Sequence, residues 1–230
     1  MRLSIIGFGV MGERLTRAAL DFDPAIVELA GVWDPSAAQM ERLRAELPNA
    51  PTLASAEAAV AEADCVYIAS PPRTHLGHAR AALEAGKAVF TEKPLGVDLA
   101  DSRAFVKEAA GERAAVNFVF ASSPAVAELK TWIAGGAVGK PSAITVAADF
   151  SAWPREWQMD AVSWLAKRAE GGFTREVLSH FLFLTGRLGG EMRLLDSHAD
   201  YPSGDLAETA IGASMQAGDT PVSVTGGVGT

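Results

Sequence analysis

The chain has 230 residues, 49% of them hydrophobic and 21% charged, a composition that excludes a disordered chain, a collagen-like repeat and a coiled coil. Its 28 acidic residues outnumber the 20 basic ones, which gives a formal net charge of −8. Because such a surface repels phosphate backbones, we expect no nucleic-acid partner.

The first half of the chain alternates short apolar runs with helical patterns. These patterns predict five strands and four helices: strands over 3–6, 27–33, 65–69, 88–90 and 114–118, and helices over 11–20, 36–47, 75–85 and 99–110. The strand Cys65–Ala69 is apolar throughout, as expected when both faces of a sheet are covered. Strands that alternate with helices of this length indicate βαβ units and a doubly wound parallel sheet, which we place in a domain over residues 1–120.

The pattern changes after about residue 120. It predicts two helices and four longer strands: helices over 125–133 and 173–184, and strands over 143–150, 192–198, 209–216 and 221–228. Alternating polar and apolar residues are typical of antiparallel strands with one open face. We therefore expect a second, α+β domain over 121–230 with an open, mostly antiparallel sheet. Its last strand has nothing after it to cover the sheet, so we also expect further residues beyond this sequence.

A glycine-rich turn, Gly7-Phe8-Gly9-Val10-Met11-Gly12, follows the first strand and opens the first helix. In that context Gly7 permits a tight turn, Gly9 lets the backbone approach a pyrophosphate and Gly12 lets helix and strand pack closely. The helix N-terminus adds free N–H groups and a positive dipole. The turn therefore predicts dinucleotide binding; the alternative is a glycine-rich turn of another α/β protein.

Asp34 ends the second predicted strand, 22 residues after Gly12. A carboxylate at this position accepts hydrogen bonds from the adenosine ribose and repels a 2′-phosphate. Residues 35–38 include no Arg or Lys to hold that phosphate. Asp34 therefore favours NAD over NADP. The alternative is that Asp34 caps the next helix, a role for which Ser36 competes.

Two further turns follow predicted strands, at the edge of the sheet where ligands bind in open α/β folds. They are Ser70-Pro71-Pro72-Arg73-Thr74-His75 and Thr91-Glu92-Lys93-Pro94-Leu95. We expect the two prolines of the first to fix an extended turn at the ligand; alternatively Thr74 caps a helix that has His75 in its first turn. Lys93 is predicted to lie at the cofactor cleft, or else to be a solvated charge.

Taken together and in this order, the glycine turn, Asp34, Ser-Pro-Pro-x-x-His and Glu-Lys-Pro-Leu resemble the glucose–fructose oxidoreductase/inositol dehydrogenase (Gfo/Idh/MocA) family. Gly135-Gly136…Gly139-Lys140-Pro141 resembles the start of that family's second domain. The resemblance implies a Rossmann domain followed by an α/β domain, in a homo-oligomer, dimer or tetramer, that assembles through the large open sheet. It implies a cofactor site made of Gly7, Phe8, Gly9, Val10, Met11, Gly12, Asp34, Ser70, Pro71, Pro72, His75, Glu92 and Lys93.

The family's second catalytic motif is a run of glycines followed by Asp and, four residues later, His. Here Gly171-Gly172 precede Glu176 and His180, with Glu176 in place of Asp. The resemblance implies that Lys93 binds the substrate oxygen, that His180 accepts the proton and that Glu176 orients or tunes the pair. The alternative is that Glu176 and His180 form an i,i+4 surface pair on a helix.

Further substrate contacts are expected from Asn117, Trp157 and Arg175. Asn117 begins the segment from which the family contacts substrate, although the Arg often found nearby is replaced by Val119 and Phe120. Trp157 is one of three tryptophans near residue 160, which form either a wall for the apolar face of a sugar or part of a core.

The resemblance thus implies an NAD-dependent oxidoreductase that moves a hydride between a nicotinamide and a small-molecule substrate, a sugar, polyol or similar secondary alcohol. The alternatives are an NAD-binding sensor or regulator without activity, and an imine or enone reductase. The single cysteine and four scattered histidines exclude a disulfide framework and predict no bound metal. No apolar run is long enough to span a membrane, so we expect no membrane partner and a cytoplasmic location.

Overall fold

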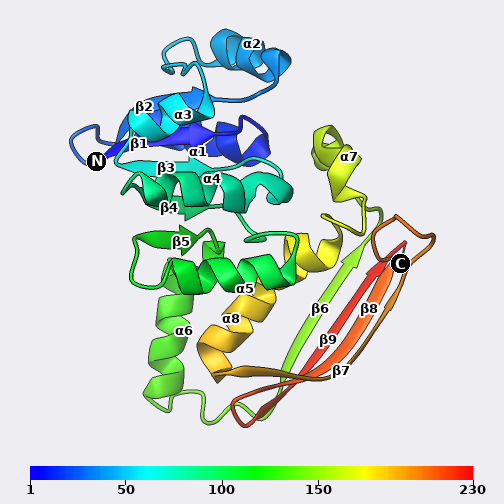
Figure 1. Cartoon of the computed structure of the whole chain (residues 1–230). Coiled ribbons are helices and arrows are strands. Elements are labelled where there is room, and N and C mark those ends of the chain that lie inside the picture. The colour runs from blue at the N-terminus through cyan, green and yellow to red at the C-terminus, as the bar shows by residue number, and fades with distance from the viewer. Residues whose placement is uncertain (230) are drawn as a thin grey trace. The chain divides into compact units, whose positions relative to one another are not determined.

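The computed structural model describes residues 1–229 and divides the chain into two compact units, Met1–Asn117 and a second that begins at Phe118 (Figure 1). The expected division after residue 120 falls within a short 3₁₀ turn, Val119–Ala121. No helix among residues 1–229 is long and apolar enough to cross a membrane.

The first unit is a parallel α/β sheet with helices on both faces, as the sequence predicts. Its elements in chain order are β1 (Arg2–Ile6), α1 (Val10–Asp21), β2 (Glu28–Trp33), α2 (Ala37–Glu46), α3 (Ala56–Ala61), β3 (Cys65–Ile68), α4 (Pro72–Glu84), β4 (Ala88–Thr91), α5 (Leu99–Glu108) and β5 (Ala114–Val116). The strand order is β2-β1-β3-β4-β5, and every neighbouring pair is parallel.

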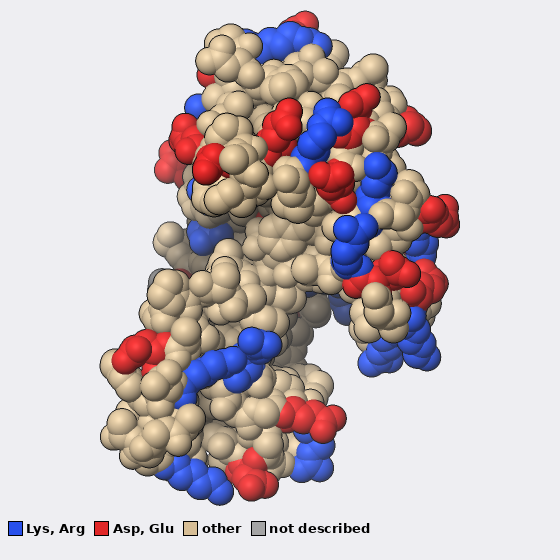
Figure 2. Space-filling model, turned by 90° about the vertical axis from the view of Figure 1, so that its left-hand side faces the viewer, with Lys and Arg blue, Asp and Glu red and all other residues tan. Residues whose placement is uncertain are grey.

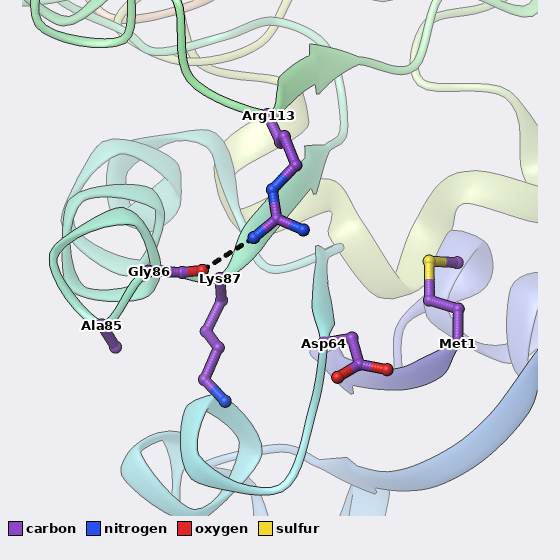
Figure 3. Close-up of a pocket in the computed structure, with 6 residues that line it drawn as sticks. All are labelled: Met1, Asp64, Ala85, Gly86, Lys87 and Arg113. Atoms are coloured by element: carbon purple, nitrogen blue, oxygen red, sulfur yellow. Dashed lines mark hydrogen bonds between the residues drawn. The ribbon is translucent and has the colours of Figure 1, made fainter.

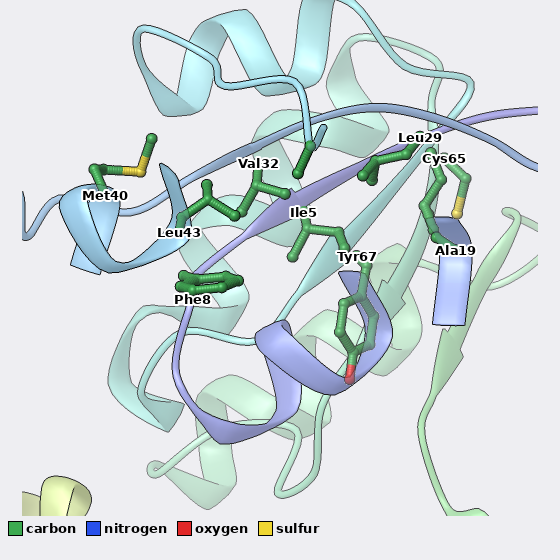
Figure 4. Close-up of a cluster of buried hydrophobic side chains, with 11 residues drawn as sticks. Ile5, Phe8, Ala19, Leu29, Val32, Met40, Leu43, Cys65 and Tyr67 are labelled. Atoms are coloured by element: carbon green, nitrogen blue, oxygen red, sulfur yellow. The ribbon is translucent and has the colours of Figure 1, made fainter. Parts of the chain in front are cut away.

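Successive residues of the strands point alternately into two hydrophobic cores, one on each face of the sheet. Ile5 and Tyr67 belong to a cluster on the α1 and α2 side, which also holds the Phe8 ring (Figure 4). Ile6 and Val66 point the other way, into a cluster with α3, α4 and α5. Because both faces of the strands are covered, their sequences are apolar without alternation.

The sheet extends by one bridged residue beyond β2. Val32 and Thr52 form a parallel bridge, in which the Val32 N–H donates to Pro51 O and the Leu53 N–H donates to Val32 O, both at 2.9 Å. Counting this segment, the order along the sheet becomes the 3-2-1-4-5-6 of dinucleotide-binding domains. A single bridged residue is too short to show a pattern of polar and apolar residues, so the sequence does not predict it. The six-residue helix α3 is also absent from the predicted elements.

The second unit is an α+β layer of helices on a four-stranded sheet. After the turn Val119–Ala121 its elements are α6 (Pro124–Ala134), β6 (Ile144–Phe150), a 3₁₀ helix (Glu156–Ala161), α7 (Val162–Leu165), a π-helical turn (Thr174–Leu178), α8 (Ser179–Gly189), β7 (Met192–Asp200), β8 (Ala210–Ala217) and β9 (Thr220–Val228). The strand order is β6-β9-β8-β7. One face of the sheet packs on a core centred on Phe173 and Leu178.

The sheet is mostly antiparallel, as expected, but one pair is not. β8 is antiparallel to both β7 and β9, whereas β6 and β9 are parallel. The expectation that β6 is also antiparallel is wrong. Two neighbouring parallel strands need a long connection between them. The connection from β6 to β9 begins with the helices between β6 and β7, and it brings β9 back beside β6 in the same direction.

Two helix predictions also need correction. The single helix expected over 173–184 is a π-helical turn followed by α8, and the Ser179 N–H donates back to Thr174 O across the widened turn. Helix α4 begins at Pro72, three residues before the expected start, with Pro71 as its extended N-cap. Proline suits the first helical position because the N–H that it lacks has no partner there. Thr74 is therefore inside the helix and is not its cap.

Charged side chains of both signs are interspersed on the face of the molecule shown in Figure 2. Several charged side chains pair across elements: Arg80 of α4, for example, donates to Asp101 and Glu108 of α5 at 2.6 and 2.8 Å. Exposed pairs of this kind contribute little to stability.

Candidate functional site: a dinucleotide loop and two strand-end turns

The glycine turn combines two tightly packed glycines with an open one. Gly7 has φ +100°, and a Cβ there would lie 2.7 Å from the Ser70 backbone N. A Cβ on Gly12 would lie 1.9 Å from Gly7 O, whereas a Cβ on Gly9 would meet nothing within 4 Å. Gly9 is also the N-cap of α1 and has no side chain to occupy the helix's first N–H groups. The open space and the positive helix end fit a pyrophosphate.

Asp34 and Arg42 hold this loop from opposite sides through the Phe8 backbone. The Phe8 N–H donates to Asp34 Oδ2 and the Phe8 carbonyl accepts from Arg42 Nη2, both at 2.7 Å. The Arg42 guanidinium lies 4.7 Å from the centroid of the buried Phe8 ring and donates from Nη1 to Glu13 at 2.6 Å. This hydrogen bond lowers the pKa of the Glu13 carboxyl. The sequence gives no sign of Arg42, because its partner Phe8 lies 34 residues away.

Ser36, and not Asp34, is the N-cap of α2. Ser36 Oγ accepts from the Gln39 N–H at 3.4 Å, and the Ser36 N–H in turn donates to Asp34 Oδ1 at 2.8 Å. Asp34 is thus part-buried at the carboxyl end of β2 and is oriented by two backbone N–H groups. Each carboxylate oxygen can accept further hydrogen bonds, so the predicted ribose contact is compatible with this geometry.

His75 ties the two strand-end turns to each other. Its Nδ1 lies 2.9 Å from Pro94 O and its Nε2 lies 2.8 Å from Ser70 O. Both partners are carbonyl oxygens, so whichever ring nitrogen carries a proton donates to one of them. The side chain is 1% exposed. The buried ring therefore positions the two turns that it joins, and the cofactor contact expected of His75 stays a prediction.

Glu92 is the centre of a second buried network at the ends of β3, β4 and β5. The Tyr67 hydroxyl donates to Glu92 Oε1, and Asn117 Nδ2 donates to the same oxygen at 2.7 Å. Burial, with the Glu92 charge, raises the pKa of the Tyr67 hydroxyl far above its usual value. One amide hydrogen of Asn117 is therefore already bonded to Glu92. Glu92 is itself buried and positions this strand end, and the cofactor contact predicted for it stays a prediction.

Lys93 follows directly on this network and is half-buried. Its strand end is held on one side by Glu92 and on the other by the bond from His75 to Pro94 O. The backbone of Lys93 is thus fixed at the carboxyl edge of the same sheet as the glycine loop, where open α/β sheets bind their ligands.

In the second unit, His180 opens α8 within an aromatic cluster. Its ring meets Phe118 edge-on at 5.8 Å between centroids and Phe120 edge-on at 6.3 Å. Phe118 in turn stacks on Phe183 at 4.4 Å. Phe118 and Phe120, from the segment expected to contact substrate, thus place aromatic rings beside the predicted proton acceptor.

The two glycines before Glu176 are required by packing. A Cβ on Gly171 would lie 2.0 Å from Leu165 O, and a Cβ on Gly172, which has φ +96°, would lie 2.2 Å from Glu208 Oε2. The buried Glu208 accepts from the Thr174 N–H at 2.7 Å and so fixes the start of the π-helical turn that carries Glu176. Such widened turns are frequent at functional sites.

The other predicted contacts of this unit have different surroundings. Arg175 Nη1 donates to Arg168 O at 2.7 Å and to Gly171 O at 3.2 Å, so this side chain braces the turn before α8. Trp153 packs in the core and donates to Leu165 O at 3.3 Å, whereas Trp157 is 52% exposed. Of the two, only Trp157 presents a large surface to solvent.

A surface pocket of about 420 Å³ lies elsewhere in the first unit (Figure 3). It is lined by Met1, Asp64, Ala85, Gly86, Lys87 and Arg113. Several of these residues directly precede strands, so the pocket is at the amino edge of the sheet, and none of the predicted site residues lines it.

Comparisons with known proteins identify the family of the chain. A family model described as an oxidoreductase family with an NAD-binding Rossmann fold (GFO_IDH_MocA) matches residues 1–120. Inositol 2-dehydrogenase 4 of Saccharopolyspora erythraea is 35% identical over 149 residues, which are 61% of this chain and 43% of that protein. UDP-N-acetylglucosamine 3-dehydrogenase of Acidithiobacillus ferrooxidans is 35% identical over 106 residues, 46% of this chain and 32% of that protein. The chain therefore spans less than half the length of these curated relatives.

Solved structures share the fold over nearly the whole chain. An NAD-binding protein from Listeria innocua has a TM-score of 0.82 at 22% identity, covering 100% of this chain and 67% of its own. The WlbA dehydrogenase from Bordetella pertussis, in complex with NADH and UDP-GlcNAcA, has a TM-score of 0.82 at 22% identity, covering 98% and 66%. The chain belongs to the Gfo/Idh/MocA family of oxidoreductases with an NAD-binding Rossmann fold.

Proposed function

We propose that this protein is an NAD-dependent dehydrogenase that moves a hydride between the nicotinamide and a secondary alcohol of a sugar or polyol. The observation that carries the proposal is the fixed position of Lys93, at the carboxyl edge of the sheet that also bears the glycine loop. Two buried networks hold the backbone on either side of Lys93, which supports a catalytic role for its side chain, since positioning is a large part of catalysis.

The two charged side chains beside the glycine loop, Asp34 and Arg42, support the choice of NAD over NADP. Asp34 keeps a carboxylate at the carboxyl end of β2, where a 2′-phosphate would meet it. Arg42, the cation close to the loop, already donates to the Phe8 carbonyl, Glu13 and Gln39. These bonds use three of its five N–H donors within the fold, which supports the choice of NAD.

The proposed roles follow from the acid–base needs of alcohol oxidation. NAD supplies the hydride acceptor when bound. Lys93 Nζ holds the substrate oxygen and stabilises its developing negative charge, His180 accepts the hydroxyl proton and Glu176 tunes the pair. The names of the curated relatives, an inositol 2-dehydrogenase and a UDP-N-acetylglucosamine 3-dehydrogenase, support a polyol or sugar as the substrate.

A substrate screen with NAD tests the proposal. The protein is mixed with NAD and a panel of inositols, sugars and sugar derivatives, and the appearance of NADH absorbance is followed. Turnover of at least one member supports the dehydrogenase. Tight NAD binding without turnover of any member would favour a sensor. NADH oxidation by imines or enones alone would favour a reductase.

A further inference from the structure

Arg155, in the loop after β6, lies among three aromatic rings. Its guanidinium carbon is 4.6 Å from the Trp157 centroid, 5.6 Å from that of Trp153 and 5.9 Å from that of Phe150. Its Nε donates to Oε1 of the buried Gln158 at 2.8 Å, and its own backbone N–H donates to the same oxygen at 3.3 Å. Stacking and the bond at Nε together fix the plane of the guanidinium.

The outer edge of this guanidinium is available for a ligand. Among residues 1–229, neither Nη1 nor Nη2 of Arg155 meets a hydrogen-bond acceptor. Partial burial lowers the pKa of the group, and the charge of Glu176 acts in the opposite direction. A pre-oriented, partly desolvated guanidinium offers two parallel N–H donors that match a carboxylate or a phosphate.

Two neighbours connect this edge with the proposed chemistry. Phe150 and Trp153 of this aromatic cluster contact the Phe173 ring at 5.4 and 6.1 Å between centroids, and Phe173 is the N-cap of the turn that carries Glu176. Trp157 presents an exposed ring beside the guanidinium, and aromatic rings of this kind pack against the apolar faces of sugars. An anion site and a flat apolar surface therefore lie side by side.

We propose that Arg155 binds an anionic group of the substrate, so that the preferred substrate is a sugar or polyol bearing a carboxylate or phosphate rather than a neutral one. The proposal rests on the proposed function, since it names the substrate class of the same site.

Arg168 provides a matched control in the same unit. Its guanidinium also stacks on one ring, that of Tyr201, at 3.9 Å, but it is exposed and has neither a second ring nor a glutamine at Nε. Substituting Arg168 by Met removes a stacked cation of the same type and leaves the Arg155 surroundings intact.

The experiment compares D-glucuronate, D-glucose 6-phosphate and D-glucose. Each is titrated calorimetrically into the full chain saturated with NAD, and NADH formation is followed separately. We expect at least one acidic sugar to bind about 10–100 times more tightly than glucose, the effect of a charge-assisted bidentate pair. Arg155→Met should abolish that ratio, Arg155→Lys should keep part of it, and Arg168→Met should leave it unchanged.

The outcomes separate the two proposals. A wild-type protein that binds glucose as tightly as both acids, or an unchanged ratio in Arg155→Met, overturns the role of Arg155. If Arg155→Met does not fold, the test uses Arg155→Lys. A smaller affinity ratio of acidic sugar to glucose in that variant supports the proposal, and an unchanged ratio counts against it. Binding of acids without NADH formation from any sugar instead contradicts the dehydrogenase. Preference for one acid over the other identifies the anion as carboxylate or phosphate.

Discussion

At Asp34, two effects on the cofactor can be separated by substitution. Its Oδ2 accepts from the Phe8 N–H, which holds the loop, and its charge repels a 2′-phosphate. Asp34→Asn keeps an oxygen acceptor and loses the charge, whereas Asp34→Ala loses both. We expect both variants to lower the NAD/NADP affinity ratio by about tenfold or more, and only Asp34→Ala to weaken NAD itself strongly. Fluorescence titration with each cofactor measures this; an unchanged ratio would remove Asp34 from cofactor selection.

Lys93 and His180 are proposed to serve one proton path. If each acts mainly in the transition state, Lys93→Met and His180→Gln should each lower kcat by about 10²–10⁴ with little change in NAD affinity. The double variant should then be barely slower than the slower single one, because removing either group already breaks the path. Steady-state kinetics on a substrate identified by the screen gives these values.

Matched controls exist for both residues. Lys87 directly precedes β4, the strand that Lys93 follows, and reaches Ala61 O with its Nζ at 3.4 Å, so Lys87→Met removes a lysine at the opposite edge of the sheet. His198 is an exposed histidine on β7. Neither Lys87→Met nor His198→Gln should slow turnover. Strictly additive effects of Lys93→Met and His180→Gln would show independent roles and contradict the shared path.

The junction of β1 and α1 gives a test at the level of the element. A Cβ on Gly9 meets nothing within 4 Å, and the residue has extended backbone, so Gly9→Val should fold normally and yet place a side chain where the pyrophosphate binds. A Cβ on Gly12 would lie 1.9 Å from Gly7 O, so Gly12→Ala should cost about 1–3 kcal/mol or more of stability. Denaturant unfolding and NAD titration distinguish the two. Gly9→Val with wild-type NAD affinity would reduce the loop to an ordinary turn.

Elements formed by local pattern were predictable from the sequence, and those formed by distant contacts were not. The strands of the first unit are apolar because both faces are covered, and Ser36 caps α2 through a bond three residues away. The bridge at Thr52 and the parallel pairing of β6 with β9 depend on distant partners and have no local signature. The same holds at the site: the glycine loop is a local motif, whereas Arg42 acts through a partner 34 residues away.

At the scale of the whole molecule, and within residues 1–229, the sheet of the second unit packs on its core with one face and turns the other face outward. Along β9, Val222 and Val224 are buried against the helices, while Ser223 and Thr225 point outward and are exposed. Ser223 Oγ lies 3.3 Å from Thr145 Oγ1 on the neighbouring β6, and Thr225 lies opposite Ala147, so the β6–β9 part of this outer face carries small side chains. Small side chains there permit close approach of a second sheet. We expect the protein to form a dimer or tetramer through it.

Thr225→Arg tests this assembly, because it places a long charged side chain in the middle of the face without touching the core. Charged residues are depleted from the centres of interfaces, since burying an unpaired charge is costly. The variant should therefore run as a monomer in size-exclusion chromatography with light scattering, with an unchanged unfolding midpoint. Ser203→Arg, in the exposed loop between β7 and β8, adds the same charge away from the face and should keep the wild-type mass. A wild-type monomer, or an oligomer that survives Thr225→Arg, would show that this face is not the interface.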